Sequence, residues 1–306
     1  MPRLARLRAV AVVALLVVPV LACEPKGSVA GPGDVKAAQA KGTLLRYQAT
    51  ARAVKTQTKI HFRLAGGGQQ GEIKSALAAT LAFSDGGSGK VNVTYRVDAV
   101  DSLDLGGMMQ SKPKEGVTPP PDPKQKLLEA KGGWVMDLRG QVDDAATKSM
   151  PENAKPDPSK AGDKAQPDTG SMMKELLAGM LRLPELPEQG LELGKPLKVE
   201  KQEQQQLSEG IPKMPIESET TYTLVSVKQE GGKDLAEVKV EAEASGATEL
   251  QQGAMLTVDT TTAGTMVFDL TSGVPIRANW QVTQNFAFGD QSQEISTQIE
   301  STYTPG

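Results

Sequence analysis

Few side chains in this sequence could do chemistry, and two of them are unique. Cys23 is the only cysteine and His61 the only histidine among the 306 residues. A Ser-His-Asp arrangement would have to use His61, and a metal site built from several histidines is excluded. His61 alternates with the apolar residues Ile60 and Phe62, so we expect it on the polar, solvated face of a strand.

Asp137 and Asp269 occupy matching places in the two halves of the chain. Each is followed by a leucine and has a glycine five residues upstream, with a valine between them. Such a pair could act as general acid and base, which would make the protein an envelope hydrolase. Aspartate at the end of a strand also commonly accepts hydrogen bonds from the following turn, and we favour this interpretation. We therefore expect no catalytic residue and no enzymatic activity.

Motifs that bind cofactors or metals are missing from the sequence. There is no G-x-S-x-G, no G-x-x-x-x-G-K-[ST] and no D-x-[DN]-x-[DN]-G. The glycine pairs at 86–87 and 231–232 precede no helix start, so they indicate turns and not phosphate-binding loops. The sequence thus predicts no cofactor and no metal site.

The first residues have the layout of a secretory signal. Three arginines precede an apolar run over residues 9–22, and no acidic residue occurs before Glu24. The run is 14 residues long, which is too short for a comfortable membrane span. We expect residues 1–22 to be a signal peptide and residues 23–42, rich in Gly, Ala, Pro and Lys, to be a flexible tether.

The residues V-L-A-C that end at Cys23 resemble the lipobox of bacterial lipoproteins. In that family the cysteine sulfur receives a diacylglycerol, the peptide is cut before the cysteine, and the new N-terminus is acylated, for example with palmitate. Ala22 fits the small residue before the cut and Val20 the branched apolar position, whereas Leu21 is bulkier than usual and Pro19 is unusual there. The resemblance implies lipidation of Cys23 and a membrane as partner; the alternative is an ordinary signal-peptide cysteine or a free thiol.

Location follows from the same resemblance. An aspartate after the cysteine is an inner-membrane retention signal in some diderm bacteria, and this chain has Glu24 instead. If the host is diderm, the resemblance implies a cell-envelope lipoprotein of the outer membrane, on its periplasmic or surface side.

Charge argues against a nucleic-acid partner. Without residues 1–22 the chain has 284 residues, with 31 basic against 37 acidic side chains. A nucleic-acid-binding protein would be expected to show a basic face. The scarcity of aromatic residues, at 4%, and the many glycines and prolines suggest a β-rich body interrupted by loose segments.

Apolar residues recur with a period of two along most of the chain, which predicts strands. The expected strands include Leu45–Ala53, Ile60–Leu64, Ser75–Phe83, Val91–Ala99, Trp134–Leu138, Ala236–Ala244, Met266–Leu270 and Val274–Val282. The sequence predicts a mainly β fold of antiparallel curved sheets, as two similar β halves in a half-barrel or sandwich-like arrangement, with one helix and long disordered insertions.

The expected organisation has an N-terminal β half over 43–140, a disordered linker over 141–170, and a helix plus a C-terminal β half over 171–306. Residues 111–125 read as a proline-rich loop, and Ser171–Leu183 as the helix. The matching Asp137 and Asp269 stretches suggest a weak internal repeat.

This plan resembles a family of uncharacterised bacterial lipoproteins, through LPELPEQGLELGKPLKVE, ETTYTLVSV and GTMVFDLTSGVPIRANWQV. No catalytic residue follows from that resemblance. We expect a non-enzymatic envelope protein that binds or scaffolds, with an envelope protein as possible partner. The alternative is a carrier whose cavity, lined by Leu45–Ala53, Val91–Ala99 or Ala236–Ala244, holds a lipid or another apolar ligand.

Overall fold

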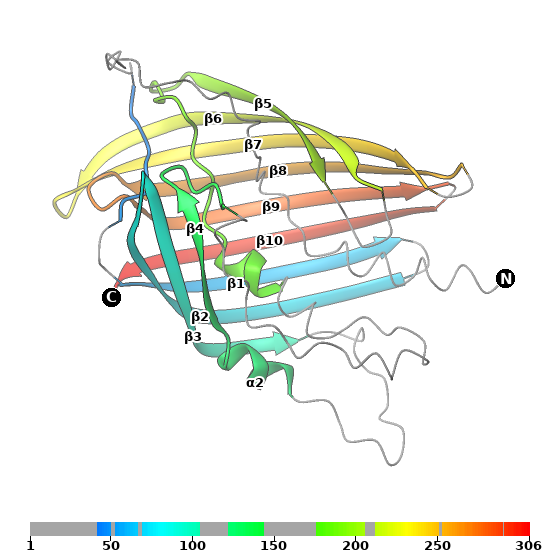
Figure 1. Ribbon diagram of the computed structural model, residues 1–306, viewed down its shortest axis with the longest axis horizontal. Coiled ribbons are helices and arrows are strands. Elements are labelled where there is room, and N and C mark those ends of the chain that lie inside the picture. Colours follow the sequence, from blue (N-terminus) through cyan, green and yellow to red (C-terminus); the bar gives the residue numbers. More distant parts are fainter. Residues whose placement is uncertain are drawn as a thin grey trace.

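A single ten-stranded antiparallel sheet forms the body of the protein (Figure 1). The computed structural model describes residues 42–49, 53–66, 69–104, 122–143, 176–205, 212–250, 253–289 and 291–306. The strands are β1 (Ala53–Gly66), β2 (Gln69–Gly87), β3 (Lys90–Asp104), β4 (Lys131–Asp137), β5 (Pro196–Gln205), β6 (Met214–Glu230), β7 (Lys233–Glu249), β8 (Met255–Asp269), β9 (Val274–Phe288) and β10 (Gln291–Pro305). The prediction of a mainly β, antiparallel fold is confirmed.

The strand order unites the two halves of the chain in one sheet. It runs β4-β3-β2-β1-β10-β9-β8-β7-β6-β5, so β1–β4 and β5–β8 are two four-stranded meanders with the hairpin β9–β10 between them. The join is the pairing of β1 with the last strand, in which Ile60 lies opposite Ile299. Tight turns close the β2–β3 and β6–β7 hairpins, where Gly87, Gly231 and Gly232 adopt positive φ angles of 72°, 58° and 77°.

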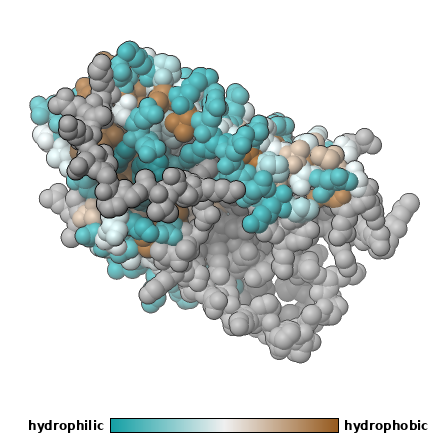
Figure 2. All heavy atoms as spheres, turned by 45° about the horizontal axis from the view of Figure 1, so that its top comes forward, coloured by the Kyte–Doolittle hydropathy of each residue, from teal (hydrophilic) through white to brown (hydrophobic). Residues whose placement is uncertain are grey.

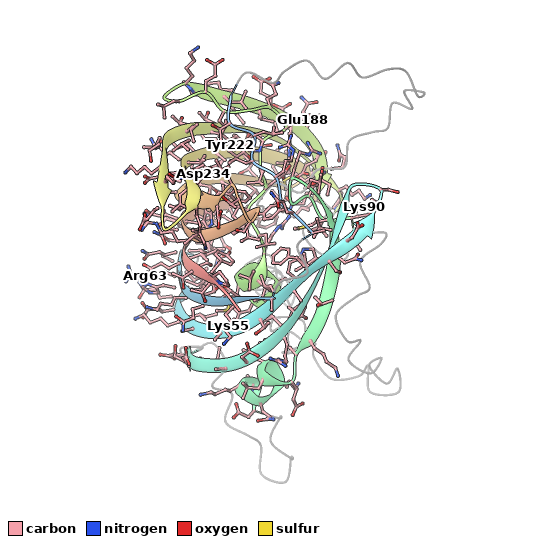
Figure 3. All side chains as sticks on the ribbon, turned by 90° about the vertical axis from the view of Figure 1, so that its left-hand side faces the viewer. Lys55, Arg63, Lys90, Glu188, Tyr222 and Asp234 are labelled. Carbon is pink, nitrogen blue, oxygen red and sulfur yellow. The ribbon has the colours of Figure 1, made fainter. Side chains whose placement is uncertain are left out.

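The alternating side chains give the sheet an apolar inner face and a polar outer face. In β1, Ile60 and Phe62 are buried whereas Lys59 and Arg63 are exposed. Figure 3 shows the sheet bent around the core side chains, with Arg63 on the outside and Tyr222 on the inner side. The chain therefore needs further segments to cover the inner face.

Two stretches provide that cover. The helix at residues 176–181 contributes Leu176, Leu177, Met180 and Leu181, which are buried in one core with the inward side chains of the sheet. The extended residues before β1 contribute Leu45 and Tyr47 to the same core. The predicted helix Ser171–Leu183 is thus confirmed over residues 176–181, and among the described helices none is long and apolar enough to cross a membrane.

The local structure differs from the expectations in four places. Residues 45–49 of the expected strand Leu45–Ala53 do not belong to the sheet: they are extended and cross the strands (Figure 1), and Ala53 is the first residue of β1. The loop expected over 111–125 ends in a helix, α2 (Pro123–Leu128), which Asp122 caps by accepting a hydrogen bond from the backbone N–H of Lys124 at 2.9 Å. Strand β5 was not expected. Residues 141–143, at the start of the predicted linker, still pair with β4 through Val142.

Matching glycines in the two meanders lie under aromatic rings of neighbouring strands. Gly132 in β4 is paired with Tyr95, and Gly264 in β8 is paired with Trp280. A Cβ atom added at either glycine would lie 2.9 Å from the Tyr95 ring or 2.3 Å from the Trp280 ring. Each glycine therefore leaves room for a large ring to lie flat across the sheet.

Replacing Gly264 by alanine tests this packing. We expect Gly264→Ala to lower the free energy of unfolding by about 1–3 kcal/mol, because the Trp280 ring and the Asn279 carbonyl must both move. Urea denaturation measures the loss. The neighbouring outward-facing change Ala263→Ser should stay within about 0.5 kcal/mol, and equal effects of the two changes would contradict the packing argument.

Candidate functional site

The chain that leads to Cys23 joins the body at the edge of the inner-face cover. Cys23 lies outside the described residues, which begin with Gly42. Thr43 and Leu191 exchange two backbone hydrogen bonds of 2.8 Å, so the entering segment is tied to the stretch between the helix and β5. We call residues 43–48 the entry segment and residues 182–194 the strap.

Two matching turns hold the other side of the entry segment. The Tyr47 N–H donates to the Leu138 carbonyl at 2.8 Å, and the Gln48 N–H donates to the Gly273 carbonyl at 3.3 Å. These turns follow Asp137 and Asp269. The internal repeat thus has a structural counterpart, because equivalent turns of the two meanders bind consecutive residues of one segment.

Asp137 and Asp269 shape these turns, as the structural interpretation predicts. One carboxylate oxygen of Asp137 accepts hydrogen bonds from the backbone N–H groups two and four residues further along the chain, at 2.8 and 2.9 Å. One carboxylate oxygen of Asp269 likewise accepts hydrogen bonds from the backbone N–H groups two and three residues further along, at 2.9 and 3.1 Å. Burial of Asp269 opposes ionisation, yet hydrogen bonds from Ser272 and Thr271 and the nearby Lys233 hold its pKa below the ordinary value. Each carboxylate therefore stabilises the turn that follows it.

Tyr47 is the central residue of the entry segment. Its side chain is 1% exposed, and its ring stands edge-on to Phe268 with centroids 5.6 Å apart. Its hydroxyl donates to the Pro184 carbonyl of the strap at 2.7 Å. Burial raises the pKa of Tyr47 well above the ordinary tyrosine value, so it stays a neutral donor.

Arg46 fastens the entry segment to the strap from the outside. Its guanidinium donates to the Pro187 carbonyl at 2.7 Å and also to the Glu188 carbonyl. Burial and the neighbouring Arg139 lower the pKa of Arg46, while Arg139 itself lies 3.8 Å from the Glu188 carboxylate. An arginine suits this place because its planar fork can serve two carbonyls at once.

A largely buried ion pair joins the strap to strand β5. The Lys201 ammonium lies 2.5 Å from the Glu185 carboxylate, whose side chain is only 9% exposed. Burial raises the pKa of Glu185, although the charge of Lys201 opposes the shift. Tyr222 of β6 donates to the Glu185 carbonyl at 3.4 Å, so the strap is bound to the edge strand β5 and to its neighbour β6.

His61 lies on the polar outer face, as predicted. It pairs with the Glu72 carboxylate across β1 and β2, and Lys74 lies 3.2 Å from the same carboxylate. The hydrogen bond from His61, with that from Lys74, lowers the pKa of Glu72 to about 2. This exposed group is an ordinary cross-strand charge cluster.

A shallow acidic trough of about 800 Å³ crosses the outer face of β5–β8. Two rows of outward-pointing side chains form the walls of the trough, and the residues that lie between these two rows form its floor. Its acidic members are Glu200, Glu217, Glu219, Glu243 and Asp259. Lys198 lies 2.7 Å from Glu219, and this hydrogen bond raises the pKa of the lysine. No group of acidic or histidine side chains within the described ranges is arranged to hold a metal ion.

Comparison with known proteins adds no relative. No protein-family model matches the chain, and no curated protein matches its sequence. The resemblance to bacterial lipoproteins therefore stays a prediction from the residues around Cys23.

Sequence reasoning missed the strap and the contacts of Arg46. Arg46 and Pro187 are 141 residues apart, and no spacing pattern relates them. No sequence pattern indicates that the carbonyls of Pro184 and Pro187 accept two of the hydrogen bonds that bind the entry segment.

Removing the Tyr47 hydroxyl should weaken the attachment of the entry segment. We expect Tyr47→Phe to lower the free energy of unfolding by about 1–2 kcal/mol, because the buried Pro184 carbonyl loses its donor. Tyr95→Phe is the matched control, since the buried Tyr95 hydroxyl has no hydrogen-bond partner among the described residues. That change should leave stability unaltered or raise it, and a larger loss at Tyr95 than at Tyr47 would contradict this account.

Glu185 should make the free energy of unfolding depend measurably on pH. A carboxyl whose pKa is raised on folding stabilises the fold most below its unfolded value near 4.5, and this contribution is lost as pH rises through the raised pKa. We therefore expect Glu185→Gln to become more stable relative to the parent as pH increases across that window. Urea denaturation at several pH values tests this. The opposite trend would mean that the attraction of Lys201 outweighs burial.

Proposed function

We propose that the protein is a lipid-anchored lipoprotein of the cell envelope with a non-enzymatic binding or scaffolding role. The observation that carries the proposal is the V-L-A-C stretch, which places the only cysteine directly after a basic start and a short apolar run. A diacylglycerol on Cys23 and an acyl group on its nitrogen supply three acyl chains, which is more than the two that stable anchoring requires.

The way the entry segment is bound supports an anchor that precedes it. Force on a lipidated N-terminus is transmitted to Thr43, whose two hydrogen bonds to Leu191 lie beside those of Arg46 and Tyr47. The segment is therefore tied to the strap and to both meanders. A membrane-attached body needs such a firm junction between tether and fold.

The positions of the candidate chemical groups favour binding over catalysis. Asp137 and Asp269 each serve a turn, and His61 pairs with Glu72 on the open outer face. The outer face of the sheet is a broad polar surface on which an envelope protein could dock. A hydrolase would need these groups to converge on one substrate.

The carrier alternative rests on the apolar inner face. Val93, Val238 and Tyr47, which come from the three faces expected to line a cavity, pack in one core with the helix and the strap. Loading an apolar ligand there requires displacing this cover. The scaffold is therefore our leading proposal.

Replacing Cys23 tests the anchoring directly. We expect Cys23→Ala to move the protein from the membrane fraction to the soluble fraction of the cell envelope, because the site of lipid attachment is lost. Ser28→Ala, in the same tether, is the control and should leave the protein with the membranes. If Cys23→Ala partitions with membranes as the parent does, the anchoring proposal is wrong.

A further inference from the structure

The helix at residues 176–181 is held differently from the rest of the cover over the inner face. Its core side chains are three leucines and a methionine, which are 1–3% exposed: Leu176, Leu177, Met180 and Leu181. In the part of the chain that the structure describes, no hydrogen bond or ion pair joins residues 176–181 to the sheet or to the entry segment. Apolar contacts alone therefore hold this helix against the sheet.

The strap, in contrast, is held by polar bonds along its length. The Leu186 N–H donates to the Arg139 carbonyl at 2.8 Å, and the Gly194 N–H donates to the Leu224 carbonyl at 2.9 Å. These bonds add to those that join the strap to the entry segment. An apolar molecule can replace apolar contacts, but it leaves a backbone group that has lost its hydrogen bond unsatisfied. The helix is therefore the part of the cover that an apolar ligand displaces most easily.

Little besides this packing favours a helix at residues 176–181. A helical stretch as short as these six residues is unstable on its own in water, and Gly179 lowers its stability further. Ordering the six residues also costs conformational entropy, which offsets much of the gain from burying the four side chains. Local opening of the helix therefore requires less free energy than unfolding of the sheet.

The position of the helix defines the kind of ligand that can replace it. Figures 1 and 3 both show this helix on the inner side of the curved sheet, beside β10 and β1. Its side chains belong to the same core as Ile60 and Ile299 of these two strands. A replacement for three leucines and a methionine must be apolar, and it must be elongated, because six helical residues extend over about 9 Å. A saturated acyl chain meets both requirements.

We propose that residues 176–181 form a releasable plug: the helix leaves the inner face while the strap stays bound, and an acyl chain takes its place. On the face of the molecule that Figure 2 shows, hydrophobic spheres are scattered among hydrophilic ones, so an acyl chain gains more from the core than from this surface. Only the helix has to move, whereas the strap and the entry segment keep their hydrogen bonds. This inference goes beyond the proposed anchoring and does not depend on lipidation of Cys23.

Hydrogen exchange of the full chain tests the release of the helix. The Arg182 N–H, which donates to the Ala178 carbonyl at 3.0 Å, reports on the helix, and the N–H groups of Leu186 and Leu191 report on the strap. We expect the Arg182 amide to be protected at least about tenfold less than the other two. Equal protection of the three amides would mean that helix and strap open together, which would overturn the proposal.

Binding of dodecanoate, measured by calorimetry, tests the ligand. The full chain carries Cys23→Ala for this purpose, so that neither its own lipid nor detergent competes. Ala178→Gly changes an exposed position of the helix and leaves the four core side chains in place. We expect this change to tighten binding about fivefold, because less free energy is spent on opening the helix. Gln189→Gly, at an exposed position of the strap, is the control and should alter the affinity by less than about twofold.

The outcomes distinguish a plug from a fixed part of the core. Bound dodecanoate should speed exchange of the Arg182 amide and leave that of the Leu191 amide unchanged. If neither the parent nor Ala178→Gly binds dodecanoate, the inner face does not accept an acyl chain and the proposal is wrong. If Ala178→Gly binds no more tightly than the parent, the ligand lies elsewhere and the proposal is equally wrong.

Discussion

The cover over the inner face of the open sheet is the constraint on which the rest of the structure depends. A ten-stranded sheet with one apolar face cannot remain open to water, and the sheet alone has nothing to pack against. The entry segment, the helix at residues 176–181 and the strap cover it together, and Tyr47 links the entry segment to the strap because it packs on Phe268 and donates to the carbonyl of Pro184. The same contacts join the two meanders, because turns from both bind the entry segment. The same segments therefore cover the core and hold the N-terminal end of the body in place.

Strands with a simple alternation were predictable from the sequence, and strands that break it were not. Ile60 and Phe62 alternate with polar residues, and β1 follows that pattern. Strand β5 could not be predicted from alternation, because its inward positions include Lys201, which pairs with Glu185 and makes no apolar contact there. Leu45 and Tyr47 also alternate, but alternation shows only that a segment is extended with one side buried. It does not show whether the segment lies beside the strands or across them.

The contacts of the candidate site follow a similar division. The capping role of Asp137 and Asp269 could be predicted, because an aspartate bonding to the next turn is a local interaction. The bond from Arg46 to Pro187 could not, because it joins residues far apart in sequence through a backbone carbonyl that any residue type could offer. The proposed lipidation of Cys23 has the opposite basis: it rests on the sequence alone, on a stretch that lies outside the described residues. The chain that leads from Cys23 enters the described part of the fold at Gly42 and Thr43.

The central claim of this account is that Cys23 is the acylated first residue of the mature protein. Mass spectrometry of the N-terminal peptide, from protein purified out of membranes, tests it most directly. The account predicts a peptide that begins at Cys23 and carries the mass of a diacylglycerol plus an N-acyl chain. A peptide that begins elsewhere, or one that contains Cys23 with a free thiol, would contradict it.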